Sequence, residues 1–162
     1  MANSFLVSVH ESFPQPLWLD RVAPFLQSVM DILQYDGEEI SVLFCSDTFM
    51  AEMNGTYRNS SGPTDILSFE DGGTYIDACG TAWTCAGDLL ISMESVERNA
   101  SYFLTDPDTE LKRVLIHGIL HLNGMDHGTE HIGHSEVPQS DMLLLQERTL
   151  AACVNTHIID GV

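Results

Sequence analysis

The sequence has little positive charge. Six lysines and arginines stand against 24 aspartates and glutamates in 162 residues, which gives a formal net charge of -18 at pH 7. A surface with this balance repels phosphate groups, so broad electrostatic binding to nucleic acid or to anionic membranes is excluded. Any polyanionic substrate must therefore be held at a small local site, with the help of a metal ion.

Long apolar runs and a cysteine framework are also missing. No stretch approaches the ~18 apolar residues of a membrane-spanning helix, and the start, MANSFLVSVHESF, lacks the basic and apolar regions of a signal peptide. The cysteines at positions 45, 79, 85 and 153 match no zinc-binding or redox spacing. We expect free thiols, although Cys79 and Cys85 could pair, in a soluble cytoplasmic protein with neither a membrane partner nor a small-molecule organic cofactor.

The apolar pattern predicts an α+β fold in a single domain over residues 1–162. Some segments have the alternating or continuously apolar pattern of strands, and others have helical spacing. The strands are expected at 5–10, 39–46, 64–70 and 87–92, and the helices at 16–35, 48–58, 93–102, 107–123 and 137–154. The turn-rich stretch between the last two strands is expected to be an excursion or a hairpin loop. This order predicts a small mixed four-stranded sheet packed with about five to six helices.

One helix has clear end signals. Asp106 suits the N-cap, Pro107 the first helical position, and Gly124 the left-handed residue that follows the helix. This central helix carries the start of the stretch HGILHLNGMDH, which contains three of the seven histidines. Asp47 is expected to cap an earlier helix.

The histidine spacing indicates a metal site. His117 and His121 share one face of the helix, offset by roughly 40° and about 6 Å along its axis, and the turn at Gly124 can return His127 as a third ligand. Three neutral nitrogen ligands leave one position open for water, as in catalytic zinc sites, where the pKa of that water falls to about 7. We therefore predict one zinc ion at the end of the helix, although nickel or another transition metal would accept the same ligands.

A general base is missing from this stretch. The spacing His-x-x-x-His-x-x-Gly-x-x-His resembles that of metzincin proteases, in which the residue after the first histidine is a glutamate that acts as the base. Here that residue is Gly118. Because a glycine inside a helix costs about 1 kcal/mol relative to alanine, we expect Gly118 to let another backbone or a substrate approach closely.

Two further motifs precede the histidines: MNGTYRNSSGPTDILSF at 53–69 and GDLLIS at 87–92. In this order, the three motifs resemble the signature of the YbeY family of bacterial endoribonucleases over most of residues 37–150. The resemblance implies a zincin-like fold, one zinc ion and cleavage of single-stranded RNA in ribosomal RNA maturation and ribosome quality control. It also implies the ribosome or a ribosomal protein as a partner.

The resemblance also implies roles for individual residues. His117, His121 and His127 match the metal ligands of the family, and Arg58 matches an arginine associated with RNA cleavage. A guanidinium at the end of the second helix can hold a scissile phosphate or stabilise the charge that develops on it. Taken alone, Arg58 could equally be a surface arginine paired with an acidic residue.

The sequence departs from the family after this arginine. Family members often carry a lysine there, where this chain has NSSG. Lys112 and Arg113, one turn before His117, could compensate, or Arg113 could simply pair with Glu110 at helical spacing.

Other polar residues are weaker candidates. Asp126 could orient an imidazole, or it could be a turn residue at the end of the helix. Asp65 and Ser68 could face the site from a strand. His131 and His134 are expected to be loop residues rather than metal ligands.

Three hypotheses for function follow. The leading one is a zinc-dependent endoribonuclease. The second is a metzincin-like metallopeptidase that lacks the usual glutamate and uses some other base. The third is a non-enzymatic ribosome-associated factor whose metal ion only stabilises the fold.

Overall fold

A mixed four-stranded sheet organises the described residues, which are 3–128, 131 and 138–160 of a computed structural model. Its strands are β1 (Ser4–Val9), β2 (Glu38–Cys45), β3 (Ile66–Ile76) and β4 (Ala82–Ser92). They lie in the order β1-β2-β4-β3. β1, β2 and β4 are parallel, and β3 runs antiparallel to β4 at one edge.

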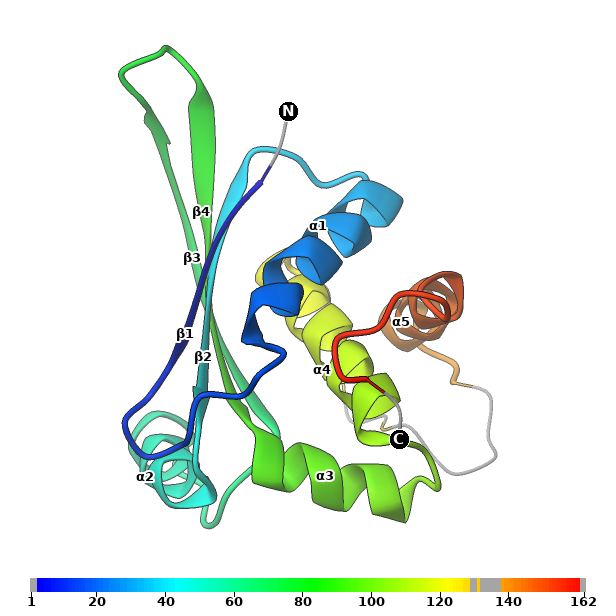
Figure 1. The fold of residues 1–162 in the computed structure, drawn as a ribbon. Coiled ribbons are helices and arrows are strands. Elements are labelled where there is room, and N and C mark those ends of the chain that lie inside the picture. Colours follow the sequence, from blue (N-terminus) through cyan, green and yellow to red (C-terminus); the bar gives the residue numbers. More distant parts are fainter. Residues whose placement is uncertain (1–2, 129–130, 132–137, 161–162) are drawn as a thin grey trace.

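Helices pack against both faces of this sheet. Within the described residues they are α1 (Val22–Leu33), α2 (Asp47–Arg58), α3 (Met93–Tyr102), α4 (Pro107–Leu122) and α5 (Asp141–Ala152), with a short 3-10 turn, η1 (Leu19–Arg21), before α1. Figure 1 shows α4 between the sheet and α5, with α1 beside it and α2 on the opposite side of the sheet. No helix in the described part of the chain is long and apolar enough to cross a membrane. The predicted α+β fold with a mixed sheet is confirmed, whereas the prediction of a single domain stays a prediction.

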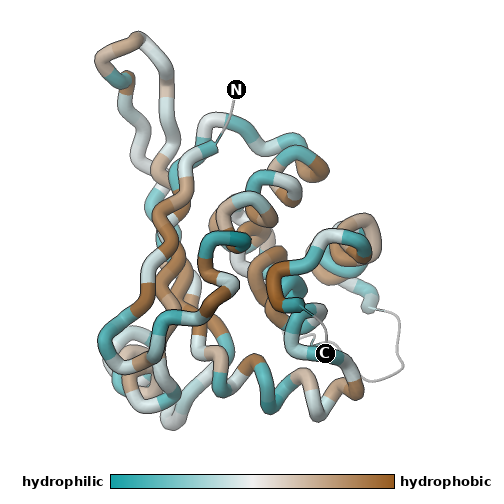
Figure 2. The backbone as a smooth tube through the Cα atoms, viewed as in Figure 1, coloured by the Kyte–Doolittle hydropathy of each residue, from teal (hydrophilic) through white to brown (hydrophobic). Residues whose placement is uncertain are grey.

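The main core lies between the sheet and α4. Figure 2 shows apolar residues gathered along the strands and on the helices that face them. α4 is the most buried of these helices because it contacts the sheet on one side and α3 and α5 on others. The core residues that it contributes are Leu111, Val114, Leu115, Ile116, Ile119, Leu120 and Leu122.

The ends of α4 agree with the sequence prediction. The Asp106 carboxylate accepts a hydrogen bond from the backbone N–H of Thr109 at 2.7 Å. Gly124 follows the helix with a φ of +86°. Both signals act within one turn of the helix, so they depend little on the rest of the fold.

Two other helix starts differ from the prediction. Ser46, not Asp47, caps α2, and its hydroxyl accepts a hydrogen bond from the backbone N–H of Phe49 at 3.2 Å. The Asp47 carboxylate instead forms an ion pair with Arg98 at 2.6 Å. α5 begins at residue 141, because Ser140 caps it, and the expected start at residue 137 lies outside the described residues.

The segment between the two C-terminal strands is more regular than expected. β3 and β4 continue through most of it as one long hairpin, with a register shift between Glu70 and Gly73. At the tip, the Asp77 carboxylate accepts hydrogen bonds from the backbone N–H groups of Cys79 and Thr81, each at 2.9 Å. Strand pairing therefore extends further than the local sequence indicates. All four cysteines are free thiols, including those in the hairpin.

Gly118 lets α4 lie close to the sheet. A Cβ atom at this position would come within 2.7 Å of a Leu89 methyl group and 2.8 Å of the Ile66 δ1 methyl group. The expectation that a backbone or a substrate approaches Gly118 was therefore wrong. Side chains of β3 and β4 fill this space instead.

The first turn of α4 also holds the segment that follows α5. The Asp108 carboxylate accepts hydrogen bonds from the backbone N–H groups of Ile158 and Ile159, each at 2.8 Å. The Lys112 ammonium donates to two backbone carbonyls of the same segment, at 3.0 and 2.9 Å. Lys112 is only 2% exposed, and these contacts, together with Asp108 at 3.6 Å, provide partners for its buried ammonium group.

Replacement of Gly87 tests the close packing of β4 on β3. In Gly87→Ala, the new Cβ atom would lie 2.1 Å from the Phe69 carbonyl oxygen, at a φ of +143°. Overpacking and backbone strain together should lower the free energy of unfolding by more than about 3 kcal/mol, as measured by denaturant titration. Gly80→Ala is the matched control, since its φ is +81° and no atom lies within 4 Å. It should cost about 1 kcal/mol, and equal losses in the two variants would contradict this account.

Candidate metal centre

α4 and the turn after it bring three histidines together. His117 and His121 lie one turn apart on the helix, and the reversal at Gly124 returns the chain as His127. The potential ligand atoms of the three side chains all lie within 4.8 Å of one another. Among the residues that the structure describes, no other group of three or more His, Cys, Asp or Glu side chains forms such a cluster.

Hydrogen bonds orient two of these imidazoles. Nδ1 of His117 lies 2.6 Å from the amide oxygen of Gln146, and Nδ1 of His121 lies 3.0 Å from the carbonyl oxygen of Met125. Since the Gln146 amide nitrogen donates to Glu147 at 3.0 Å, its oxygen must face the imidazole. Both histidines therefore carry their proton on Nδ1 and present the lone pair of Nε2, the form in which imidazole binds a metal ion.

Burial also keeps these imidazoles neutral. It lowers the pKa of His117 to about 4 and lowers that of His121 as well. At pH 7 a metal ion would therefore not compete with protons for their nitrogen atoms. Three histidines that border open cavities are the donor set of a catalytic zinc site. The residues present fit zinc, and they would also accept other transition metals.

A cavity of about 270 Å³ lies beside two of the histidines, and Arg58, Ser68, His117 and His121 are among the residues that line it. The Arg58 guanidinium donates to the Ser68 carbonyl oxygen at 2.5 Å, and its centre lies 5.1 Å from the centre of the Phe69 ring. The fold therefore brings Arg58 next to the histidines. Ser68 holds the arginine through its backbone rather than through its hydroxyl group.

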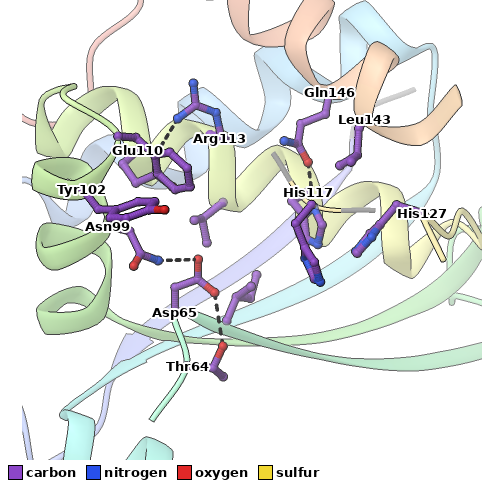
Figure 3. Close-up of a pocket in the computed structure, with 14 residues that line it drawn as sticks. Thr64, Asp65, Asn99, Tyr102, Glu110, Arg113, His117, His127, Leu143 and Gln146 are labelled. Atoms are coloured by element: carbon purple, nitrogen blue, oxygen red, sulfur yellow. Dashed lines mark hydrogen bonds and ion pairs between the residues drawn. The ribbon is translucent and has the colours of Figure 1, made fainter. Parts of the chain in front are cut away.

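A larger cavity, of about 430 Å³, also borders His117 (Figure 3). Asp65 lines it, and its carboxylate accepts a hydrogen bond from the Asn99 amide at 3.1 Å. Burial raises the pKa of Asp65. Burial also raises the pKa of Glu110 to about 7, although the ion pair with Arg113 at 2.5 Å opposes the shift. The larger cavity is therefore lined by two carboxyl groups beside Arg113, whereas the smaller one is lined by Arg58 and one carboxylate, Glu70.

The other two basic candidates are engaged in structural contacts. Arg113 lies between two carboxylates, 2.5 Å from Glu110 and 3.1 Å from Glu147. Lys112 is buried against the C-terminal segment. Pairing with Glu110 is thus the correct interpretation of Arg113, and neither residue compensates for the lysine missing after Arg58.

The remaining candidates lie around the turn after α4. Asp126 is exposed, and its carboxylate accepts a hydrogen bond from the backbone N–H of Gly128 at 3.0 Å, which lowers its pKa. The ring centre of His131 lies 5.6 Å from that of His127. His134 lies outside the described residues.

Sequence reasoning missed two residues of the site. Gln146 is only 2% exposed, and it falls on the buried stripe of α5 between Met142 and Leu150, at intervals of four residues. A polar residue on the apolar face of a helix needs a buried hydrogen-bond partner. This spacing could therefore have indicated that Gln146 has such a partner. Glu110 was considered as a partner of Arg113 and as an acidic residue in the first turn of the helix, but not as part of the site, because its position in the cavity depends on residues from other elements.

These features define a class of protein: a small α+β fold with a three-histidine cluster at the end of a central helix. A family model described as Endoribonuclease YbeY matches residues 10–151. A protein named Endoribonuclease YbeY from Treponema pallidum is 45% identical over 87% of this chain and 84% of its own. The Treponema denticola protein of the same name is 41% identical over 98% of both chains.

A solved structure shares the fold. The solution structure of a Thermotoga maritima protein matches with a TM-score of 0.58 at 24% identity, covering 90% of this chain and 86% of the other. The family model and the relatives together lead to one conclusion. This chain belongs to the YbeY endoribonuclease family.

Replacement of Gln146 tests its orienting role. Gln146→Leu removes the acceptor for His117 and should weaken zinc binding about 10- to 100-fold, as measured at pH 7 by competition with a chromogenic chelator. Gln146→Glu retains an acceptor for His117 but loses the hydrogen bond to Glu147, and it should bind zinc more tightly than Gln146→Leu. If Gln146→Leu keeps full affinity, the hydrogen bond does not orient the ligand.

Acid should destabilise the metal-free protein through His117. Its pKa is about 4 in the folded state and about 6.5 in an unfolded chain, so between these values the unfolded state binds more protons. The free energy of unfolding should therefore fall as the pH is lowered through this window, by up to about 3 kcal/mol from this group. Denaturant titrations after chelation should show a steeper loss for the wild type than for His117→Gln. If the free energy of unfolding falls equally with pH in the wild type and in His117→Gln, His117 is not buried as a neutral imidazole.

Proposed function

We propose that this protein is a metal-dependent endoribonuclease that cleaves single-stranded RNA in ribosomal RNA maturation and ribosome quality control. Family membership supports the activity. The observation that carries the proposal is that Arg58 shares a cavity with two neutral histidines of a three-histidine cluster. The ribosome or a ribosomal protein would be the partner, and the cytoplasm the place of action.

Arg58 supplies local positive charge in a chain whose formal net charge is -18. Contacts with Ser68 and Phe69 fix the plane of its guanidinium. A fixed guanidinium can donate two parallel hydrogen bonds to one phosphate group. This arrangement suits the binding of one scissile phosphate. The acidic surface of the protein would disfavour a long contact with the RNA backbone.

The three histidines would hold a zinc ion beside that phosphate. Such an ion supplies Lewis acidity, which activates water or polarises a phosphoryl oxygen. Gln146 keeps His117 in the ligating tautomer. Arg58 stabilises the negative charge that develops on the phosphate during cleavage.

The peptidase alternative has less support. In metzincins the base stands at the position of Gly118, but here that position faces Leu89 and Ile66 so closely that even a methyl group would touch them. A glutamate there would be forced into an apolar contact, where an unpaired carboxylate is costly. Some other group would have to act as the base.

Cleavage of an end-labelled single-stranded RNA by zinc-loaded protein tests the proposal directly. The wild type should cut the RNA, and His121→Ala, purified identically, should not, which guards against a contaminating nuclease. Equal cleavage by both proteins, or cleavage by neither, would contradict the proposed metal-dependent ribonuclease activity. Cleavage of casein would instead support the peptidase, and binding of RNA or ribosomes without cleavage would support the non-enzymatic factor.

Arg58→Ala should lower kcat/KM for RNA about 100- to 1,000-fold, because it removes a charge aimed at the developing phosphate charge. Zinc affinity should not change, since Arg58 lies outside the histidine cluster. Arg148→Ala, at another exposed arginine on α5, is the charge-matched control and should keep wild-type activity. Cleavage of RNA by Arg58→Ala at the wild-type rate would show that Arg58 has no role in the reaction.

A further inference from the structure

We propose that the larger cavity is a nucleobase subsite, which receives the base next to the scissile phosphate and prefers bases with an amino group over uracil. The inference rests on the proposed ribonuclease function. It assigns a ligand to the side of the histidine cluster that Arg58 does not occupy.

The two cavities share a wall. His117 and Ile66 line both of them, whereas Arg58 lines only the smaller one. A nucleotide is larger than its phosphate, so an RNA phosphate held at Arg58 must extend its sugar and base beyond the smaller cavity. The larger cavity is the adjoining space on the other side of His117.

The larger cavity disfavours a second phosphate. Asp65 and Glu110 both line it, and the neighbouring cation, Arg113, is already paired with Glu110 and Glu147. Because two carboxylates already share Arg113, this arginine offers an anion little attraction. The chemistry instead suits a neutral ligand that donates hydrogen bonds.

Asp65 is the group that would accept hydrogen bonds from such a ligand. Its side chain accepts hydrogen bonds from neutral donors, which are the Asn99 amide at 3.1 Å, the Thr64 hydroxyl at 3.4 Å and the backbone N–H groups of Asp65 and Ile66. Figure 3 shows Asp65, Asn99 and Thr64 at one side of the cavity. The amino groups of guanine, adenine and cytosine can donate to a carboxylate. Uracil has carbonyl oxygens in place of these amino groups, and its one edge donor, the ring N–H, lies between two oxygens that a carboxylate repels.

The walls of the cavity suit a flat ring. Ile66, Val114 and Leu143 provide apolar surface, and the aromatic rings of Tyr102 and Phe103 also line the cavity. Their centres are 5.0 Å apart at 80°, so the two rings present perpendicular faces. Exposed bases of single-stranded RNA are commonly bound by aromatic stacking together with hydrogen bonds to their edges. The volume, about 430 Å³, falls within the usual range for small-molecule pockets.

Cleavage of oligouridine that contains one guanosine, adenosine or cytidine tests the subsite. The zinc-loaded wild type should cut next to the inserted nucleotide about 5- to 100-fold faster than between uridines, the range expected for one hydrogen-bonded base contact. Asp65→Asn should lose this preference, because its amide offers N–H groups to the carbonyl oxygens of uracil. Glu97→Gln, which removes a carboxylate from the exposed side of α3, should keep the preference.

A binding measurement separates this inference from the proposed function. The 2′-O-methyl trinucleotide UGU should bind the wild type at least about fivefold more tightly than UUU, even if no RNA is cleaved. Asp65→Asn should bind the two equally. If that variant does not fold, Tyr102→Ala, at a side chain that is 64% exposed, should weaken the binding of UGU. Equal binding of both trinucleotides to the wild type, or a preference that survives Asp65→Asn, would overturn the subsite.

Discussion

The close contact between α4 and the sheet at Gly118 is the constraint on which the candidate metal centre depends. Because Gly118 has no side chain, the Leu89 and Ile66 side chains pack directly against the helix, and His117 and His121 lie beside the cavity that Arg58 lines. A larger residue at this position would push the helix away from the strands. The histidines would stay together on their helix, but they would move away from the arginine that comes from α2.

The distribution of charge gives the site its selectivity. Four of the six lysines and arginines form ion pairs with acidic residues in the described structure, and Arg58 instead lies at a cavity beside the histidines. The paired residues are Arg21, Arg98, Lys112 and Arg113. In the proposed function, Arg58 would hold a phosphate locally, while the acidic surface would disfavour a long contact with the RNA backbone.

Features that depend on neighbouring residues could be predicted from the sequence. The ends of α4 follow from Asp106 and Gly124, and the meeting of the three histidines follows from helical spacing and one turn. Features that depend on tertiary contacts could not. The orientation of His117 requires Gln146 from α5, and the larger cavity requires Asp65 and elements that are distant in sequence. A hairpin was one of the two expectations for the segment between β3 and β4, but the extent of its strand pairing could not be predicted, since the pairing continues through residues that are typical of turns.

The hydrogen bonds between the first turn of α4 and the segment after α5 have a consequence for biosynthesis. The buried ammonium of Lys112 bonds to the carbonyl of Thr156, 44 residues later in the chain. During translation the amino-terminal half of the sheet can form early, but the helix that bears two of the histidines cannot fully pack until that later segment has been made. The three-histidine cluster is therefore expected to reach its final geometry only late in the production of this protein.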